Sequence, residues 1–115
     1  MIELSLARPL TVGDTGVTDV NDVESVRAFC DRFAARLIER YLAQGMSWES
    51  ADLAINRVYD LMILNCGSSV PRFAWDVFLA FDGGECSNPK GDSFTRPHIE
   101  ELARGGPPNK SWSVP

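Results

Sequence analysis

Apolar residues recur every three or four positions through the middle of the chain, which is the spacing that places them on one face of a helix. In the first such segment the apolar face consists of Val23, Val26, Cys30, Phe33, Leu37 and Tyr41. Asn21 or Asp22 can cap the start of this segment, and Gly45 is well placed to end it. The pattern predicts a long amphipathic helix over residues 22–44.

A second apolar stripe runs from Trp48 to Cys66, and the Ser47 hydroxyl can cap the amides at its start. This stripe predicts a helix over residues 47–66 that ends near Gly67. The opposite side of the same helix carries polar residues at helical spacing, namely Glu49, Asp52, Asn56 and Asp60. We therefore expect the second helix to bury one face and to present carboxylates on the other.

A third apolar run, "RFAWDVFLAFD", follows Pro71, a residue that suits the first turn of a helix. We predict a helix over residues 71–82. A buried strand over residues 77–81 remains the alternative, because a short apolar run has no period that separates the two. Gly83 or Gly84 is expected to supply the left-handed residue that ends the helix.

A turn and a fourth helical segment follow these glycines. The sequence "SNPKG" is rich in turn-forming residues. The sequence "TRPHIEELARGG" places a proline and two glutamates early, an arginine late and two glycines at the end. It predicts a short helix over residues 97–104.

The two ends of the chain lack helical spacing. Residues 1–20 contain a proline and two glycines, which predict an irregular or weakly β arm, and their charge is mainly acidic. Residues 105–115, "GGPPNKSWSVP", predict an extended tail. Trp112 lies in this tail where no helix can bury it, so it either packs back onto the domain or anchors a partner.

Three main helices with short links pack most simply as an antiparallel bundle, closed here by the fourth helix. The predicted fold class is mainly α, and the 115 residues form a single domain, 1–115. The aromatic residues expected to dominate the core or its rim are Trp48, Phe73, Trp75, Phe78 and Phe81.

The balance of charge bears on the partner rather than on the fold. The chain has 16 acidic residues against 11 lysines and arginines, a formal net charge of −5. An acidic surface repels the phosphate backbone of nucleic acids, whereas it attracts a basic protein. A basic protein is therefore the expected partner.

Cysteine and histidine usage argues against a metal centre. Cys30, Cys66, Cys86 and the single His98 form neither a disulfide framework nor a zinc-ligand pattern, so we expect no metal or other cofactor. The first residues do not resemble a secretion signal, and no apolar run approaches the length of a membrane span. We expect a cytoplasmic protein with free thiols.

The loop that begins at Asp82 is the strongest candidate for chemistry. Its acids lack the alternating spacing of a calcium loop, and Lys90 precedes a glycine where a phosphate-binding loop has the reverse order. Cys86 and His98 could act as nucleophile and base only if the fold joined them. We therefore expect no enzyme, and we keep a small enzyme or metal-binding protein centred on residues 82–98 as an alternative.

Two further charged patterns have ordinary structural explanations. Asp76 interrupts the third apolar run, and Arg72 lies one turn earlier, so an exposed ion pair accounts for it better than a buried acid does. Arg32, Arg36 and Arg40 form a cationic stripe on the first helix. Such stripes are typical of a solvated face and indicate an anionic partner only weakly.

A short, acidic, helical chain without a catalytic constellation is similar to bacterial immunity proteins and other small protein inhibitors. The resemblance covers composition and architecture only, and it transfers no binding residues. It implies a protein that neutralises or holds a basic partner such as a toxin or an enzyme. The residues expected to contact that partner are Glu49, Asp52, Asp60, Asp82, Glu85, Asp92 and Trp112.

A third hypothesis is a structural adaptor or oligomer subunit. In that case exposed aromatic residues, such as Trp48 and Trp112, would form the interface.

Overall fold

The computed structural model describes residues 2–16, 22–67 and 69–105, and within these ranges all regular structure is helical. The elements are α1 (Ile2–Ala7), the 3-10 helix η1 (Val12–Thr15), α2 (Val23–Ala43), α3 (Trp48–Cys66), α4 (Arg72–Cys86) and α5 (Asp92–Arg104). The predicted mainly helical bundle is confirmed. The alternative strand over residues 77–81 is wrong, because these residues lie within α4.

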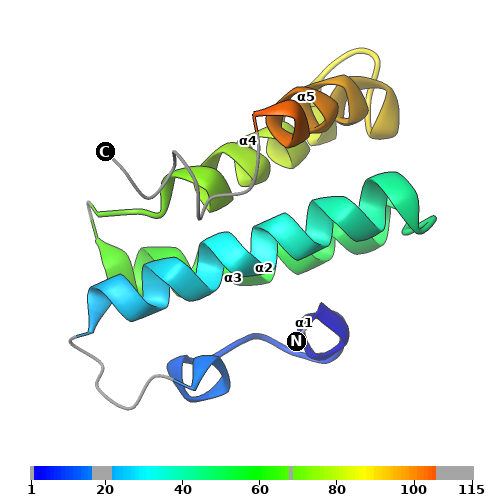
Figure 1. Ribbon diagram of the computed structural model, residues 1–115. Coiled ribbons are helices and arrows are strands. Elements are labelled where there is room, and N and C mark those ends of the chain that lie inside the picture. The colour runs from blue at the N-terminus through cyan, green and yellow to red at the C-terminus, as the bar shows by residue number, and fades with distance from the viewer. Residues whose placement is uncertain (1, 17–21, 68, 106–115) are drawn as a thin grey trace.

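The four long helices alternate in direction along the chain (Figure 1). α2 and α3 pack side by side, α4 packs on both of them, and α5 packs on α4. The N-terminal segment covers the opposite side of the bundle, where α1 contacts α3 and η1 contacts α2. As a result, the start of α3, the end of α4 and the start of α5 lie at the same end of the molecule.

The ends of α2 and the start of α3 form as the sequence predicts. The Asp22 carboxylate caps α2 by accepting a hydrogen bond of 3.1 Å from the Ser25 amide. Gly45 follows α2 with a φ of +73°, a left-handed conformation that glycine adopts at little cost. Ser47 caps α3 by accepting a hydrogen bond of 3.1 Å from the Ser50 amide.

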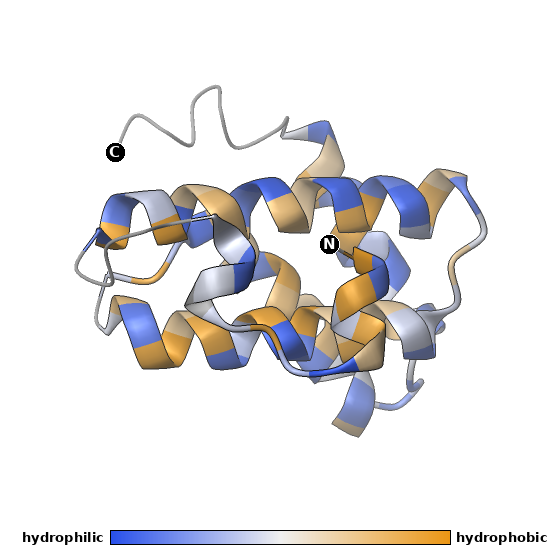
Figure 2. Ribbon diagram, turned by 90° about the horizontal axis from the view of Figure 1, so that it is seen from below, coloured by the Kyte–Doolittle hydropathy of each residue, from blue (hydrophilic) through white to orange (hydrophobic). Residues whose placement is uncertain are grey.

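Long helices in this protein are amphipathic, and their apolar faces meet in a single core. Figure 2 shows apolar and polar residues alternating along each long helix. Tyr41, Phe73 and Phe81 are among the largest fully buried side chains, and Phe78 is also buried. Trp48 and Trp75 are partly buried against this core, so the predicted aromatic residues do form the core and its rim.

The end of α4 differs from the prediction. The helix continues through Gly83 and Gly84 to Cys86, instead of ending at residue 82. Neither glycine has a positive φ, so neither acts as a left-handed helix terminator. The prediction relied on the local preference of glycine for helix ends, and tertiary packing overrides that preference here.

Gly84 allows α5 to approach α4 closely. A Cβ atom added at Gly84 would lie 2.4 Å from the Thr95 Oγ1 atom and 3.2 Å from both the Gly91 carbonyl oxygen and the Trp48 ring. Thr95 is fully buried, and its hydroxyl donates a hydrogen bond of 2.9 Å to the Ala80 carbonyl oxygen. The same hydroxyl accepts a hydrogen bond of 2.9 Å from the Trp48 indole. One threonine side chain therefore joins α3, α4 and α5.

The start of α5 also differs from the prediction. α5 begins at Asp92 rather than at residue 97, and Pro97 lies inside it. The amides of Phe94 and Thr95 donate hydrogen bonds to the Gly91 carbonyl oxygen, which builds the first turn ahead of the proline. Pro97 has no amide hydrogen to donate to the carbonyl group one turn earlier in the helix. Because Pro97 is exposed, that carbonyl group can face water instead.

The N-terminal arm is helical rather than weakly β. α1 buries Ile2 and Ser5, and the Ser5 carbonyl oxygen accepts a hydrogen bond of 3.1 Å from the Arg57 guanidinium on α3. The proline and glycines that argued against a long helix lie after α1, so they do not prevent one short helical segment before Pro9. Contacts with α3 stabilise a helix too short to persist alone.

No helix in the described ranges combines the length and the apolar character that crossing a membrane requires.

Substituting Gly84 by alanine should destabilise the protein by about 1 to 3 kcal/mol, because the added methyl group meets a hydroxyl held by two hydrogen bonds. Gly83→Ala is the matched control. Its Cβ would meet only the ring of the half-buried Phe94, which can move, so the loss should be smaller. Thermal or urea unfolding of both variants measures the difference. Equal stability of the two variants would contradict a tight joint at Gly84.

Candidate functional site

Three of the seven predicted partner-contacting residues come together at one end of the bundle. Asp52 lies in the first turns of α3, while Asp82 and Glu85 lie in the last turns of α4. α3 and α4 are antiparallel neighbours, so these turns face each other. The carboxyl groups interact, since Glu85 and Asp82 both act on the ionisation of Asp52. We call Asp52, Asp82 and Glu85 the acidic cluster.

Burial raises the pKa of the Asp52 carboxyl to about 7. The negative charge of Glu85, a hydrogen bond between the two carboxyl groups and the charge of Asp82 all act in the same direction. The Asn56 side-chain amide opposes them by donating a hydrogen bond of 3.2 Å to the Asp52 carboxylate. Asp52 therefore holds its proton to a higher pH than a solvated aspartate does.

No cation neutralises the acidic cluster within the described part of the chain. The ion pairs of residues 2–16, 22–67 and 69–105 involve none of its three members. Asp82 and Glu85 are exposed, and Asp52 is half-buried. The cluster is thus open to an external cation.

The other predicted acids occupy different positions. Glu49 and Asp60 are exposed on α3, one turn before and about two turns after Asp52, so they extend the acidic stripe. Asp92 lies in the first turn of α5. It accepts hydrogen bonds from the Tyr41 hydroxyl and, at 3.1 Å, from the Arg96 guanidinium, which together lower its pKa. Asp92 therefore serves an internal contact.

Trp112, the seventh predicted contact residue, lies outside the described residues.

The N-terminal segment does not present a free acidic surface. Glu3 pairs with Arg40 on α2, and Asp14 forms an ion pair of 2.7 Å with Arg8. Asp22 caps α2, and Glu24 pairs with an arginine one turn later. Asp19 lies outside the described residues. The N-terminal residues are mainly acidic, as predicted. Their acids in the described residues, however, form contacts within the protein.

Three aromatic side chains follow the acidic cluster along both helices, starting one turn away on α4 and two turns away on α3. Tyr59 of α3 stacks on Phe78 of α4 with ring centroids 4.1 Å apart, and Trp75 lies 6.0 Å from Tyr59 and 5.7 Å from Phe78. Phe78 precedes Asp82 by four residues, so this ring and this carboxylate are neighbours on α4, while Tyr59 follows Asp52 by seven residues on α3. We call Tyr59, Trp75 and Phe78 the aromatic trio.

Sequence reasoning identified two members of the trio as core residues and overlooked Tyr59. Its spacing of seven residues from Asp52 on α3 is the signal that could have placed it on the same side of the helix.

The residues proposed for an enzyme or metal site are not brought together. His98 stacks on Phe94 and contacts its carbonyl oxygen at 2.9 Å through Nδ1. Cys86 is an exposed residue at the end of α4, and no hydrogen bond among the described residues joins it to His98. In the same ranges, no three histidine, cysteine or acidic residues are grouped so that they could hold a metal ion. Buried Cys30 and Cys66 have raised thiol pKa values because of that burial.

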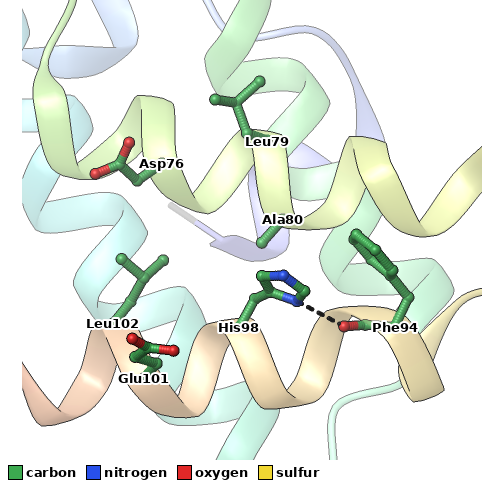
Figure 3. Close-up of a pocket in the computed structure, with 7 residues that line it drawn as sticks. All are labelled: Asp76, Leu79, Ala80, Phe94, His98, Glu101 and Leu102. Atoms are coloured by element: carbon green, nitrogen blue, oxygen red, sulfur yellow. Dashed lines mark hydrogen bonds between the residues drawn. The ribbon is translucent and has the colours of Figure 1, made fainter. Parts of the chain in front are cut away.

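Asp76 does not form the expected ion pair with Arg72 within the described structure. It is half-buried, and desolvation raises its pKa while Arg72 acts only as a more distant opposing charge. Asp76 lies beside a groove of about 420 Å³ between α4 and α5, which is lined by Asp76, Leu79, Ala80, Phe94, His98, Glu101 and Leu102 (Figure 3).

The arginine stripe of α2 borders a second groove, of about 570 Å³, against α1. Arg40 pairs with Glu3, while Arg32 and Arg36 are exposed beside the buried rings of Phe29 and Phe33. Paired and solvated guanidinium groups of this kind match the predicted solvated face.

Comparisons with protein-family models, with curated proteins and with solved structures found no match to this chain.

Replacing Asp52 by asparagine should stabilise the protein at pH 8 and have little effect at pH 4. The carboxyl pKa is about 7 in the folded protein and near 4 in the unfolded chain, so the folded state binds an extra proton between these values. Stability of the natural chain therefore falls as pH rises from about 4 to about 7, and Asp52→Asn removes that loss. Solvent screens a half-buried group, so we expect a gain of about 1 kcal/mol at pH 8.

Urea unfolding at a series of pH values measures this effect. Asp60→Asn is the control, since it removes an exposed carboxylate from the same helix. A stability difference for Asp52→Asn that does not vary with pH would contradict the raised pKa.

Proposed function

We propose that the chain is a small binding protein that holds a basic protein through the outer surface of α3 and α4, in the manner of an inhibitor or immunity protein. The observation that carries this proposal is the acidic cluster, in which Glu85 and Asp82 act on the Asp52 carboxyl group without an internal cation among the described residues. Their mutual repulsion is an unfavourable arrangement that an arginine or lysine of a partner would relieve.

A cation supplied by the partner would act most strongly on Asp52. Its carboxyl group is half-buried and already receives a hydrogen bond from Asn56, so its orientation is held before any partner arrives. A guanidinium placed between Asp52 and Glu85 would favour the ionised form of Asp52. Binding near neutral pH would then release a proton from Asp52.

The aromatic trio supplies the apolar part of the same surface. Tyr59 and Trp75 are each half-buried, so they combine a fixed position with an accessible edge. Binding energy at protein interfaces is concentrated in residues of this type, while neighbouring charges guide approach and orientation. The partner that fits this surface therefore has basic residues next to an apolar patch.

The hypothesis of a structural adaptor or oligomer subunit is supported by residues other than Trp48. That hypothesis named Trp48 as an interface residue. Trp48 packs against Phe81 and donates a hydrogen bond to Thr95, so it is used in the contact of α3 with α4 and α5. Leu64 on α3 is 82% exposed and Ile63 is 46% exposed. An interface built on these residues would produce a mass above that of one chain at high concentration.

Neutralising the cluster in the triple variant Asp52→Asn, Asp82→Asn and Glu85→Gln should weaken binding to a partner isolated from the native cell by about tenfold or more. The charge-matched control is Glu39→Gln, Glu100→Gln and Glu101→Gln, which removes three exposed carboxylates elsewhere. Both variants raise the net charge by three. Titration calorimetry compares their affinities, and equal losses would show that only net charge matters.

Affinity for the same partner should rise with pH between 6 and 8, by at most about tenfold, because ionised Asp52 is the form that binds a cation. The Asp52→Asn variant cannot ionise at this position, so its affinity should be less dependent on pH. Calorimetry in buffers of different ionisation enthalpy measures the released proton directly. Parallel pH profiles for the variant and the natural chain would count against a binding site at Asp52.

A further inference from the structure

The groove between α4 and α5 is a second surface, separate from the one on which the proposed function rests. Both helices contribute apolar side chains to it, namely Leu79 and Ala80 of α4 and Phe94 and Leu102 of α5 (Figure 3). Leu79 is 45% exposed, although it is a large apolar residue. The groove therefore leaves apolar surface uncovered, which is typical of a surface that binds a partner.

Two carboxyl groups give the groove a negative charge. Asp76 of α4 and Glu101 of α5 line it, and no lysine or arginine belongs to the lining. Asp76 is half-buried and forms no ion pair within the described residues. Desolvation raises its pKa, and the charge of Arg72 opposes that effect only in part. A partner that is both apolar and positively charged would therefore match the lining.

The carboxyl groups and the aromatic ring lie at different ends of the groove. Figure 3 shows Asp76 and Glu101 at the end marked by Leu102, and the Phe94 ring at the other end. The His98 ring lies between them and stacks on the Phe94 ring with centroids 4.6 Å apart. From Leu102 back to Phe94 the groove follows eight residues of α5, or about 12 Å of helix. A matching partner has its cation about two helical turns from its apolar group.

A helix meets these requirements better than an extended segment or a small molecule does. Side chains line the groove, so an extended segment would find few partners for its backbone N–H and C=O groups. A helix pairs those groups internally, and its residues i and i+7 lie on one face about 10.5 Å apart. Leu79, His98 and Glu101 are exposed, so a small molecule in the groove would stay largely in water.

We propose that this groove binds an amphipathic helix of a partner protein, with the apolar face of that helix against Leu79 and Phe94 and a lysine or arginine two turns away against Asp76 and Glu101. Apolar contact supplies affinity, and the two carboxylates fix the direction in which the helix lies, because reversal would move its cation to the apolar end. The proposal does not rest on the acidic cluster or on the proposed function.

Titration calorimetry of the full chain with a synthetic peptide tests this proposal. The peptide is an alanine-based helix of about three turns with leucines at i and i+4 and lysines at i+7 and i+8. A side-chain lactam holds it helical, because a free helix of this length is marginal in water. The double variant Asp76→Asn and Glu101→Gln should weaken binding by about fivefold or more, and so should Leu79→Gln.

Matched variants control for net charge and for the loss of a leucine. Glu39→Gln with Glu100→Gln removes two exposed carboxylates outside the groove, and Leu64→Gln replaces a leucine that is 82% exposed on α3. Both should keep the affinity within about twofold of the natural chain. A second peptide with glutamine in place of both lysines should bind more weakly. It should not distinguish the natural chain from Asp76→Asn with Glu101→Gln, since it has no cation for these carboxylates.

Several results would overturn the proposal. No binding of the lysine peptide, or equal weakening by the groove variant and its charge control, would do so. Binding lost in Asp52→Asn, Asp82→Asn and Glu85→Gln but kept in the groove variants would assign the peptide to the acidic cluster, and the proposed function would stand. Displacement of the peptide by an equal concentration of butylammonium would indicate a small cationic ligand instead. The mass of a dimer that Leu79→Gln converts to a monomer would indicate a second copy of the chain.

Discussion

The close contact of α5 with α4 at Gly84 is the constraint on which the arrangement of this protein depends. Thr95 fits there only because Gly84 has no side chain, and its buried hydroxyl serves both the Trp48 indole and the Ala80 carbonyl oxygen. A buried polar group without a partner is costly, so both hydrogen bonds must form together with the close packing. Helices α3, α4 and α5 are thereby locked at one end of the bundle.

The same contact creates the candidate binding surface. If α4 ended at residue 82, Glu85 would belong to a loop and its position relative to Asp52 would not be determined. Because the packing of Gly83 and Gly84 against α5 keeps α4 helical to Cys86, Glu85 instead faces the first turns of α3. A structural joint on one side of α4 thus determines the electrostatics on the other side.

The acidic cluster carries a cost that the fold does not relieve. A half-buried carboxyl group with two further carboxyl groups near it is destabilising at neutral pH, and an arginine or lysine nearby would remove the cost. The N-terminal segment shows that this chain does pair its acids where they serve the fold, as Glu3 and Asp14 do. Acids without an ion pair among the described residues, near the aromatic trio, are what supports the proposed binding surface.

Sequence alone determined the features that depend on local order. The spacing of apolar residues defined α2 and α3, and short-range hydrogen bonds from Asp22 and Ser47 placed their starts where the capping pattern indicated. The sequence also identified the acids of α3 and α4 as candidate binding residues, because charge and helical spacing can be read directly from the order of residues. Tertiary structure decided the end of α4, the start of α5 and the helical N-terminal segment. At the end of α4 contacts between distant residues outweighed a local preference, and the packing of α4 on α3 brought Asp52 together with Asp82 and Glu85.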